Sequence, residues 1–161
     1  MINKFIGIDP GQGGGIACLD KNGGVEAIAM PIAGKRIDVA QLSEWIYDRA
    51  KKGDAIACLE KVHSMPGQGV SSTFSFGFGT GALYGMLVAM RIPVYEPAPQ
   101  TWKKLILADT PKDKQAAMDY CARVYPQVSL LATARSKKSH SGIADAICIA
   151  RYALEKYKDV L

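Results

Sequence analysis

The chain has few of the residues that build disulfide-rich or zinc-bound folds. It contains four cysteines and two histidines among 161 residues, and no two cysteines stand in a CxxC spacing. Zinc fingers and zinc ribbons take their ligands from such pairs, so we do not expect a structural zinc site. The cysteines lie within apolar segments, which is typical of buried, reduced thiols in a cytosolic protein.

Features of a secreted or membrane-spanning chain are also lacking. The first residues, Met1–Lys4, run straight into an expected strand without the charged-then-apolar layout of a signal peptide. Residues 62–90 carry no formal charge and are long enough to cross a bilayer, but glycines and hydroxyl side chains make them weakly hydrophobic. We therefore expect a buried helix in this stretch, no membrane partner and a cytoplasmic location.

There is no internal repeat and no low-complexity tail. A hydrophobic fraction of 48% and a charged fraction of 22% are ordinary for a folded domain, and we expect residues 1–161 to form one. The formal net charge of +5 favours polyanionic partners, although only mildly.

Strand and helix patterns follow one another in an order typical of α/β proteins. Three apolar segments joined by glycine-rich turns predict an antiparallel meander, and two later strands separated by a helix predict parallel pairing. The sequence thus predicts a mixed five-stranded sheet flanked by helices. The expected strands are Lys4–Asp9, Gly15–Asp20, Val25–Met30, Asp54–Glu60 and Pro93–Glu96, and the expected helices begin after Asp38 and cover Thr73–Arg91, Gln100–Leu107, Lys112–Val124 and Ser141–Lys156.

Three acidic residues stand at matching places in this pattern. Asp9 and Glu60 each end an apolar strand, and Asp145 lies near the start of the apolar final helix. A carboxylate in such a setting is costly unless something pairs with it. If the first and fourth strands are parallel neighbours, their carboxyl ends place Asp9 and Glu60 side by side, with Asp145 able to face them.

Like charges this close repel one another unless a cation lies between them. An all-oxygen ligand set suits Mg²⁺ or Mn²⁺, and such a site suits attack of water on a phosphodiester. Asp9, Glu60 and Asp145 are therefore the candidate metal ligands and catalytic residues.

Two sets of glycines allow more than one interpretation. Gly11 and Gly13–Gly15 follow the first acid, where a backbone without side chains would either admit a phosphate or simply form a tight turn. Gly77, Gly81 and Gly85 recur every fourth residue, so they share one helix face. That face would pack either against a second copy of the chain or against the sheet of the same copy.

Several segments resemble one known family. Ile6–Gly11, Cys58–Val62 and Ala144–Ala146 are similar to the three acidic motifs of RuvC-type Holliday-junction resolvases, which are dimeric endonucleases of the ribonuclease-H-like superfamily. Ala98–Lys103 and Lys112–Gln115 resemble the segments that carry phosphate-contacting lysines in that family. The resemblance covers nearly the whole chain, in order, and its compact form is similar to phage-encoded members, whose location would be the host-cell cytoplasm.

The resemblance implies a ribonuclease H-like fold and a role for each motif. Asp9 would bridge two Mg²⁺ or Mn²⁺ ions, with Glu60 and Asp145 each completing one coordination shell. Lys103 and Lys114 would hold the scissile strand by its phosphates. His63 stands where the family has an aromatic wedge, and it would either stack on a base opened at the junction or remain a solvated loop residue.

The chain departs from the family at the fourth metal ligand. The family often has an acidic or polar ligand about one turn before the last aspartate, whereas here Ser141 and His140 stand four and five residues before Asp145. Neutral imidazole binds Mn²⁺, so His140 leads, with Ser141 or no ligand as the alternatives. Lys137 and Lys138, in the basic run just ahead, would either contact the DNA backbone or be solvated.

The function implied is that of a metal-dependent, structure-selective endonuclease. It would resolve four-way junctions as a homodimer, by paired symmetric nicks that leave 5′-phosphate and 3′-hydroxyl ends. The alternative is a branched-DNA-binding protein that keeps the fold with a disabled site. A sugar-kinase or actin-like phosphotransferase would need two such domains, and the chain has room for one.

Overall fold

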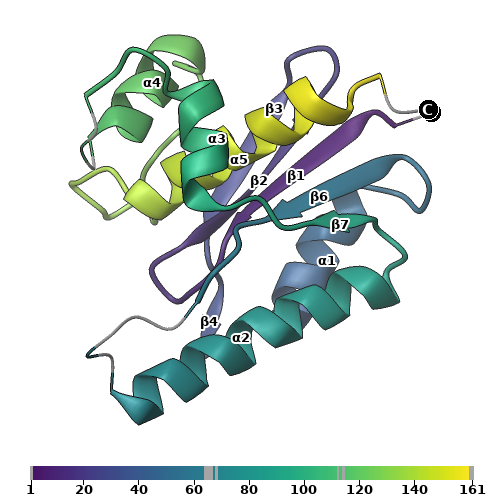
Figure 1. The fold of residues 1–161 in the computed structure, drawn as a ribbon, viewed down its shortest axis with the longest axis vertical. Coiled ribbons are helices and arrows are strands. Elements are labelled where there is room, and N and C mark those ends of the chain that lie inside the picture. The colour runs from purple at the N-terminus through teal and green to yellow at the C-terminus, as the bar shows by residue number, and fades with distance from the viewer. Residues whose placement is uncertain (1, 64–66, 68, 112, 114, 160–161) are drawn as a thin grey trace.

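A computed structural model of the chain describes residues 2–63, 67, 69–111, 113 and 115–159. It contains a five-stranded sheet in the order β3-β2-β1-β6-β7 and a separate two-stranded hairpin, β4-β5 (Figure 1). The elements are β1 Lys4–Asp9, β2 Gly15–Asp20, β3 Val25–Ala29, β4 Ile32–Ala33, β5 Arg36–Ile37, α1 Val39–Arg49, β6 Ala55–Leu59, α2 Val70–Ala89, β7 Val94–Tyr95, α3 Pro99–Ile106, α4 Ala116–Val124 and α5 Ser141–Tyr157.

The centre of the sheet is the parallel pair β1 and β6. β1 also pairs antiparallel with β2, and β2 with β3, while β7 continues the parallel half beyond β6. The prediction of a mixed sheet, with three antiparallel strands followed by two parallel ones, is confirmed. Both central strands run toward the same edge, where the carboxyl ends of parallel strands form a binding site in many α/β proteins.

Helices cover both faces of this sheet (Figure 1). Along β1, Ile6 and Ile8 face the core that α1 and α2 close, whereas Phe5 faces the core closed by α3, α4 and α5. This alternation follows from the two-residue period of a strand. The side that carries Phe5 is also the side of Asp9, so the strand end points its acid toward α5.

The helix α5 lies unusually close to β1 at Gly7. A Cβ atom built on Gly7 would stand 2.2 Å from the main-chain oxygen of Ala146 and 2.2 Å from the main-chain nitrogen of Ala150. No other residue type fits there, because these contacts are with backbone that cannot rotate away. The glycine therefore determines how near α5 comes to the sheet.

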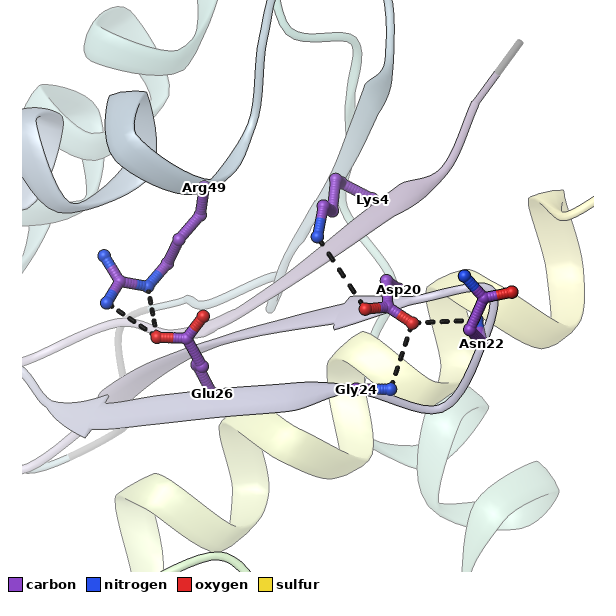
Figure 2. A network of polar contacts seen from close by, with 6 residues as sticks. All are labelled: Lys4, Asp20, Asn22, Gly24, Glu26 and Arg49. Carbon is purple, nitrogen blue, oxygen red and sulfur yellow. Dashed lines mark hydrogen bonds and ion pairs between the residues drawn. The ribbon is translucent and has the colours of Figure 1, made fainter.

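Polar contacts at the other end of the strands, away from Asp9, stabilise the β2–β3 turn and join the end of α1 to the sheet (Figure 2). Asp20 accepts hydrogen bonds from the backbone N–H groups of Asn22 and Gly24 at 2.8 and 3.0 Å. The Arg49 guanidinium donates two hydrogen bonds to one Glu26 oxygen, at 3.0 and 2.7 Å, and so joins α1 to β3. These contacts lie away from Asp9, Glu60 and Asp145, and they stabilise the sheet and its attachment to α1.

Several expected elements differ from the observed ones by one or two residues at an end, and three differences are larger. The hairpin β4-β5 follows β3 directly and has no counterpart in the expected elements; its strands are too short to show a period. α2 begins at Val70 rather than Thr73, and α4 at Ala116 rather than Lys112. The predicted cap of α1 is confirmed, since Asp38 Oδ1 accepts from the Gln41 N–H at 3.0 Å.

The expectation that residues 62–90 hold a buried helix is wrong for one side of α2. Leu83, Met86 and Leu87 are buried against the sheet, but Phe74 is 72% exposed. The glycine face points outward, because a Cβ on any of its three glycines, Gly77, Gly81 and Gly85, would meet nothing within 4 Å. The sheet of the same copy is therefore not its partner. None of the helices in the described part of the chain combines the length and hydropathy needed to cross a bilayer.

Candidate metal centre

Three elements bring the acidic side chains to one edge of the sheet. Asp9 is the last residue of β1, and Glu60 follows β6 directly. The parallel register pairs Ile8 with Leu59, so the two acids are the next residues in that register. Asp145 lies in the second turn of α5, the helix that packs on β1.

The Asp9 carboxyl is largely buried and lies within the electrostatic influence of both other acids. Burial raises the pKa of its carboxyl from 3.8 to about 8, and the negative charges of Glu60 and Asp145 add to the effect, while Lys103 opposes it. A carboxyl that remains protonated to this pH is one that lacks a compensating cation. The position therefore favours a bound positive charge.

Asp145 shows the same behaviour to a smaller degree. Burial raises the pKa of its carboxyl from 3.8 to about 6, with Lys103 lowering it and Glu60 raising it. Asp145, Lys103 and Ser141 line one cleft of about 1080 Å³ between α3, the loop after it and α5. Of the three acids, Asp145 is the one that lines this cleft and is open to a ligand within it.

Glu60 is held by a contact that the sequence did not reveal. The indole N–H of Trp102, in α3, donates a hydrogen bond to Glu60 Oε1 at 2.8 Å. The Trp102 side chain is fully buried. The orientation of this carboxylate thus depends on α3 as well as on β6.

These residues fit a divalent cation by their chemistry, although the site is not closed. Among the described residues, no group of three or more acidic, histidine or cysteine side chains already stands in a metal-binding arrangement. Glu60 raises the pKa of both Asp9 and Asp145, and the three carboxylates together form the oxygen-rich, negatively charged set that Mg²⁺ and Mn²⁺ prefer. Rotation of the side chains toward a shared cation would remove the repulsion between them.

Comparison with solved structures identifies the architecture. RuvC of T. thermophilus in complex with a Holliday junction substrate matches with a TM-score of 0.63 at 16% identity, over 92% of this chain and 90% of that one. A second Thermus thermophilus RuvC structure matches with a TM-score of 0.57 at 17% identity, over 95% and 93%. The chain has the RuvC fold. No protein-family model and no curated protein sequence matches it.

Within the RuvC fold, the fourth ligand position stays a prediction. His140 is the N-cap of α5, and its Nδ1 accepts from the Ile143 N–H at 3.3 Å, which leaves Nε2 as the only nitrogen available to a metal. Ser141 is exposed and shares the cleft with Asp145, whereas His140 does not line it. The geometry thus favours Ser141 over His140 for a contact inside the cleft.

The glycine-rich loop after β1 is a tight turn with one open position. Gly11 has a φ of +113°, and the Gly14 N–H donates to its carbonyl at 3.1 Å. A Cβ on Gly142, in α5, would stand 2.3 Å from the Gly13 oxygen, so the start of this helix rests on the loop. The turn interpretation is confirmed, and phosphate binding at exposed Gly13 stays a prediction.

The other candidate residues that the structure describes are exposed. Lys103 is exposed, and its ammonium stands 5.1 Å from the centre of the Trp102 ring. His63 is exposed three residues after Glu60, and Lys137 and Lys138 are exposed in the loop before α5. Lys114 lies outside the described residues. Their contacts with DNA stay predictions.

Two features of the site were missed from the sequence. One is the Trp102–Glu60 hydrogen bond, which joins positions 42 apart in the chain. A buried tryptophan needs an acceptor for its N–H, so Trp102 did signal a polar partner, but not which one. The other is the contact of the Gln12 amide with the Lys35 carbonyl at 2.6 Å, which joins the glycine-rich loop to the unexpected hairpin.

Proposed function

We propose that the protein is a metal-dependent endonuclease that resolves four-way DNA junctions. The observation that carries this proposal is the convergence of Asp9, Glu60 and Asp145 at one sheet edge, where burial and mutual repulsion raise the pKa of Asp9 to about 8. The RuvC fold supports it, because one of the matching structures holds a Holliday junction substrate. A net charge of +5 suits a polyanionic partner.

In the proposed reaction, Asp9, Glu60 and Asp145 would together hold two Mg²⁺ or Mn²⁺ ions, with Asp9 as the ligand shared by both. When bound, such ions would activate a water molecule and stabilise the departing oxygen. In the overall hydrolysis, the water oxygen bonds to phosphorus, the bond from phosphorus to the 3′ oxygen breaks, and a proton released by the water is balanced by the one that the 3′ oxygen takes up through solvent. The products are a 5′-phosphate and a 3′-hydroxyl.

The proposed role of Lys103 is to position the scissile strand. Its ammonium is exposed in the cleft that Asp145 lines, and its charge lowers the pKa of both Asp9 and Asp145. A phosphate entering the cleft would find this cation beside the acids. Such a contact contributes affinity and register but not sequence preference. Lys137 and Lys138 would extend the contact along the backbone.

The test of this function is cleavage of a labelled four-way junction in the presence of Mg²⁺ or Mn²⁺. We expect the native protein to nick two strands symmetrically, and Asp145→Asn to lose turnover while retaining junction binding, since the amide keeps the shape but not the charge. Gel analysis of end-labelled strands and fluorescence anisotropy measure the two properties. Absence of cleavage by the native protein with either metal would exclude the proposal.

A second candidate is a protein that binds branched DNA without cutting it. It is favoured by the open arrangement of the acids among the described residues and by the engagement of His140 Nδ1 in a helix cap. The same assay separates the two functions. Tight junction binding with intact strands under both metals would support this candidate.

We also propose a homodimer that forms through the exposed face of α2. This face combines open glycines with exposed apolar side chains at helical spacing, an arrangement that allows close approach of a second helix. Exposed apolar side chains that share one helix face often mark an interface. Two sites related by symmetry would suit paired nicks. The side chains are Val70, Phe74, Phe78, Tyr84 and Val88.

Replacing Gly81 with glutamate should convert the dimer into a monomer. The change places a charge at the centre of the proposed contact, where it would be buried without a partner. Light scattering measures the mass, and Ala40→Glu, on the exposed side of α1, is the matched control. A dimer that survives Gly81→Glu, or a native monomer, would show that this face is not the interface.

A further inference from the structure

The indole nitrogen, which is the only polar atom of the Trp102 side chain, points toward the candidate metal ligand Glu60. Trp102 is the largest fully buried side chain among the described residues, with 0% of its surface exposed. Its indole N–H donates to Glu60 Oε1 at 2.8 Å. A buried N–H needs an acceptor, and main-chain carbonyls supply most of them. Here the acceptor is the Glu60 carboxylate, which accepts no other hydrogen bond from the described side chains.

Both partners of this hydrogen bond are anchored through the backbone. The Glu60 N–H donates to the Ile8 carbonyl at 3.0 Å, which continues the β1–β6 pairing by one residue. The next N–H, that of Lys61, donates to the Pro97 carbonyl at 2.9 Å, two residues before α3 begins. The indole and the carboxylate therefore lie on segments that backbone hydrogen bonds join to each other, and this pairing brings the two side chains together.

We propose that Trp102 is a positioning residue that holds the Glu60 carboxylate in its metal-binding orientation. The indole N–H occupies Oε1 and leaves Oε2 free to face a cation. Because the donor is neutral, it orients the carboxylate without cancelling its charge, which a lysine or arginine donor would do. This inference rests on the proposed function, in which Glu60 is a metal ligand.

The ring of Trp102 has a second, separable contact. The Lys103 ammonium lies over it at 5.1 Å, which is within the range of cation–π attraction. Among the described residues, no ion pair joins Lys103 to an acid, so the ring keeps this cation beside the carboxylates without a direct salt bridge. A test of the N–H must therefore keep the ring.

The test replaces the indole of Trp102 by benzothiophene, whose sulfur removes the N–H and keeps the bicyclic ring. The chain has two tryptophans, so a Trp45→Phe background confines the replacement to position 102 when the tryptophan analogue is supplied during expression. Trp45 lies in α1, on the other face of the sheet. The protein that carries Trp45→Phe with a normal indole at position 102 is the matched control.

Calorimetric titration with Mn²⁺ in the absence of DNA should show binding weakened about 10- to 100-fold, the usual effect of losing a group that orients a metal ligand. In junction cleavage, the Mn²⁺ concentration giving half the maximal rate should rise by the same factor, and the rate should recover at saturating metal. A residue that only supported packing would lower the melting temperature without moving the metal requirement.

A double-mutant cycle connects the effect to Glu60. In a Glu60→Gln background, the benzothiophene replacement should change Mn²⁺ affinity by less than about twofold, because the carboxylate that it orients is already gone. Full additivity of the two changes would overturn the proposal, and so would unchanged Mn²⁺ affinity with Glu60 intact.

Failure of the proposed function would look different. A control protein that neither binds Mn²⁺ nor cleaves the junction would overturn the metal-dependent nuclease and, with it, the role of Trp102. A control that binds and cleaves normally, beside a benzothiophene protein that matches it, would overturn the role of Trp102 alone. Trp102→Phe is the less informative variant, since it also removes part of a fully buried ring.

Discussion

Asp9→Asn is expected to abolish junction cleavage and, at the same time, to stabilise the metal-free protein. Loss of the central carboxylate should lower the cleavage rate by about 10³-fold or more, which corresponds to roughly 4 kcal/mol of the activation barrier. The free energy of unfolding of the metal-free protein should increase, because burial and the neighbouring acids make the ionised form of Asp9 unfavourable in the folded state.

The sign of the stability effect follows from the pKa of Asp9. Folding raises this pKa from 3.8 to about 8, so the unfolded chain ionises first as the pH rises. As the pH rises from 3.8 to about 8, the free energy of unfolding of the native protein falls relative to that of Asp9→Asn. Above about pH 8 this free-energy difference no longer grows. Asp145, with a pKa raised to about 6, should show a smaller gain over a narrower pH range. Urea unfolding in the presence of a chelator, repeated across this pH range, measures the free-energy difference.

A matched control shows whether the gain belongs to the site. Asp48→Asn removes the charge of an exposed aspartate on α1 and should neither lower cleavage nor stabilise the protein as Asp9→Asn does. Addition of Mn²⁺ should stabilise the native protein and reverse its disadvantage, since a ligand that binds only the folded state adds to its stability. If Asp9→Asn were less stable than the native protein at neutral pH without metal, the carboxylates would not be in conflict and the case for a cation site would fail.

The strands and the acids could be predicted from the sequence because both depend on local pattern. Lys4–Asp9 and Gly15–Asp20 have the observed bounds, since each apolar run ends at a charge or a glycine turn. The parallel pairing of β1 with β6 follows from the intervening helix α1, and this pairing alone brings Asp9 beside Glu60. Candidate site residues that lie at the ends of strands can therefore be predicted from the sequence.

The parts that could not be predicted depend on contacts between distant segments. The direction in which α2 presents its glycines was left open, because helical spacing shows that they share a face but not what the face meets. The acceptor for Trp102 is a residue on another element, and nothing in the spacing of the two singles it out. The role of Gly7 was hidden for the same reason, since a glycine within a strand has several explanations until the helix above it is placed.

Gly7→Ala is expected to be among the most destabilising single-atom additions in this chain. The new Cβ would stand 2.2 Å from main-chain atoms of Ala146 and Ala150, where apolar contacts normally lie at about 3.5–4 Å. α5 would have to move outward by about 1 Å or more, at a cost of about 3 kcal/mol or more. Because Asp145 precedes Ala146, the same shift should lower cleavage by about 10²-fold in whatever fraction stays folded. Urea unfolding and single-turnover cleavage measure the two effects.

Two companion variants show that the obstacle is the backbone of α5. Gly13→Ala, in the loop beside the same acids, meets open space and should unfold at nearly the native urea concentration. Ala150→Gly should not rescue Gly7→Ala, since the clash is with the backbone of Ala150 and that glycine adds its own helix penalty of about 1 kcal/mol. Native-like stability of Gly7→Ala would mean that α5 lies farther from β1, and Asp145 farther from Asp9, than the proposed metal centre requires.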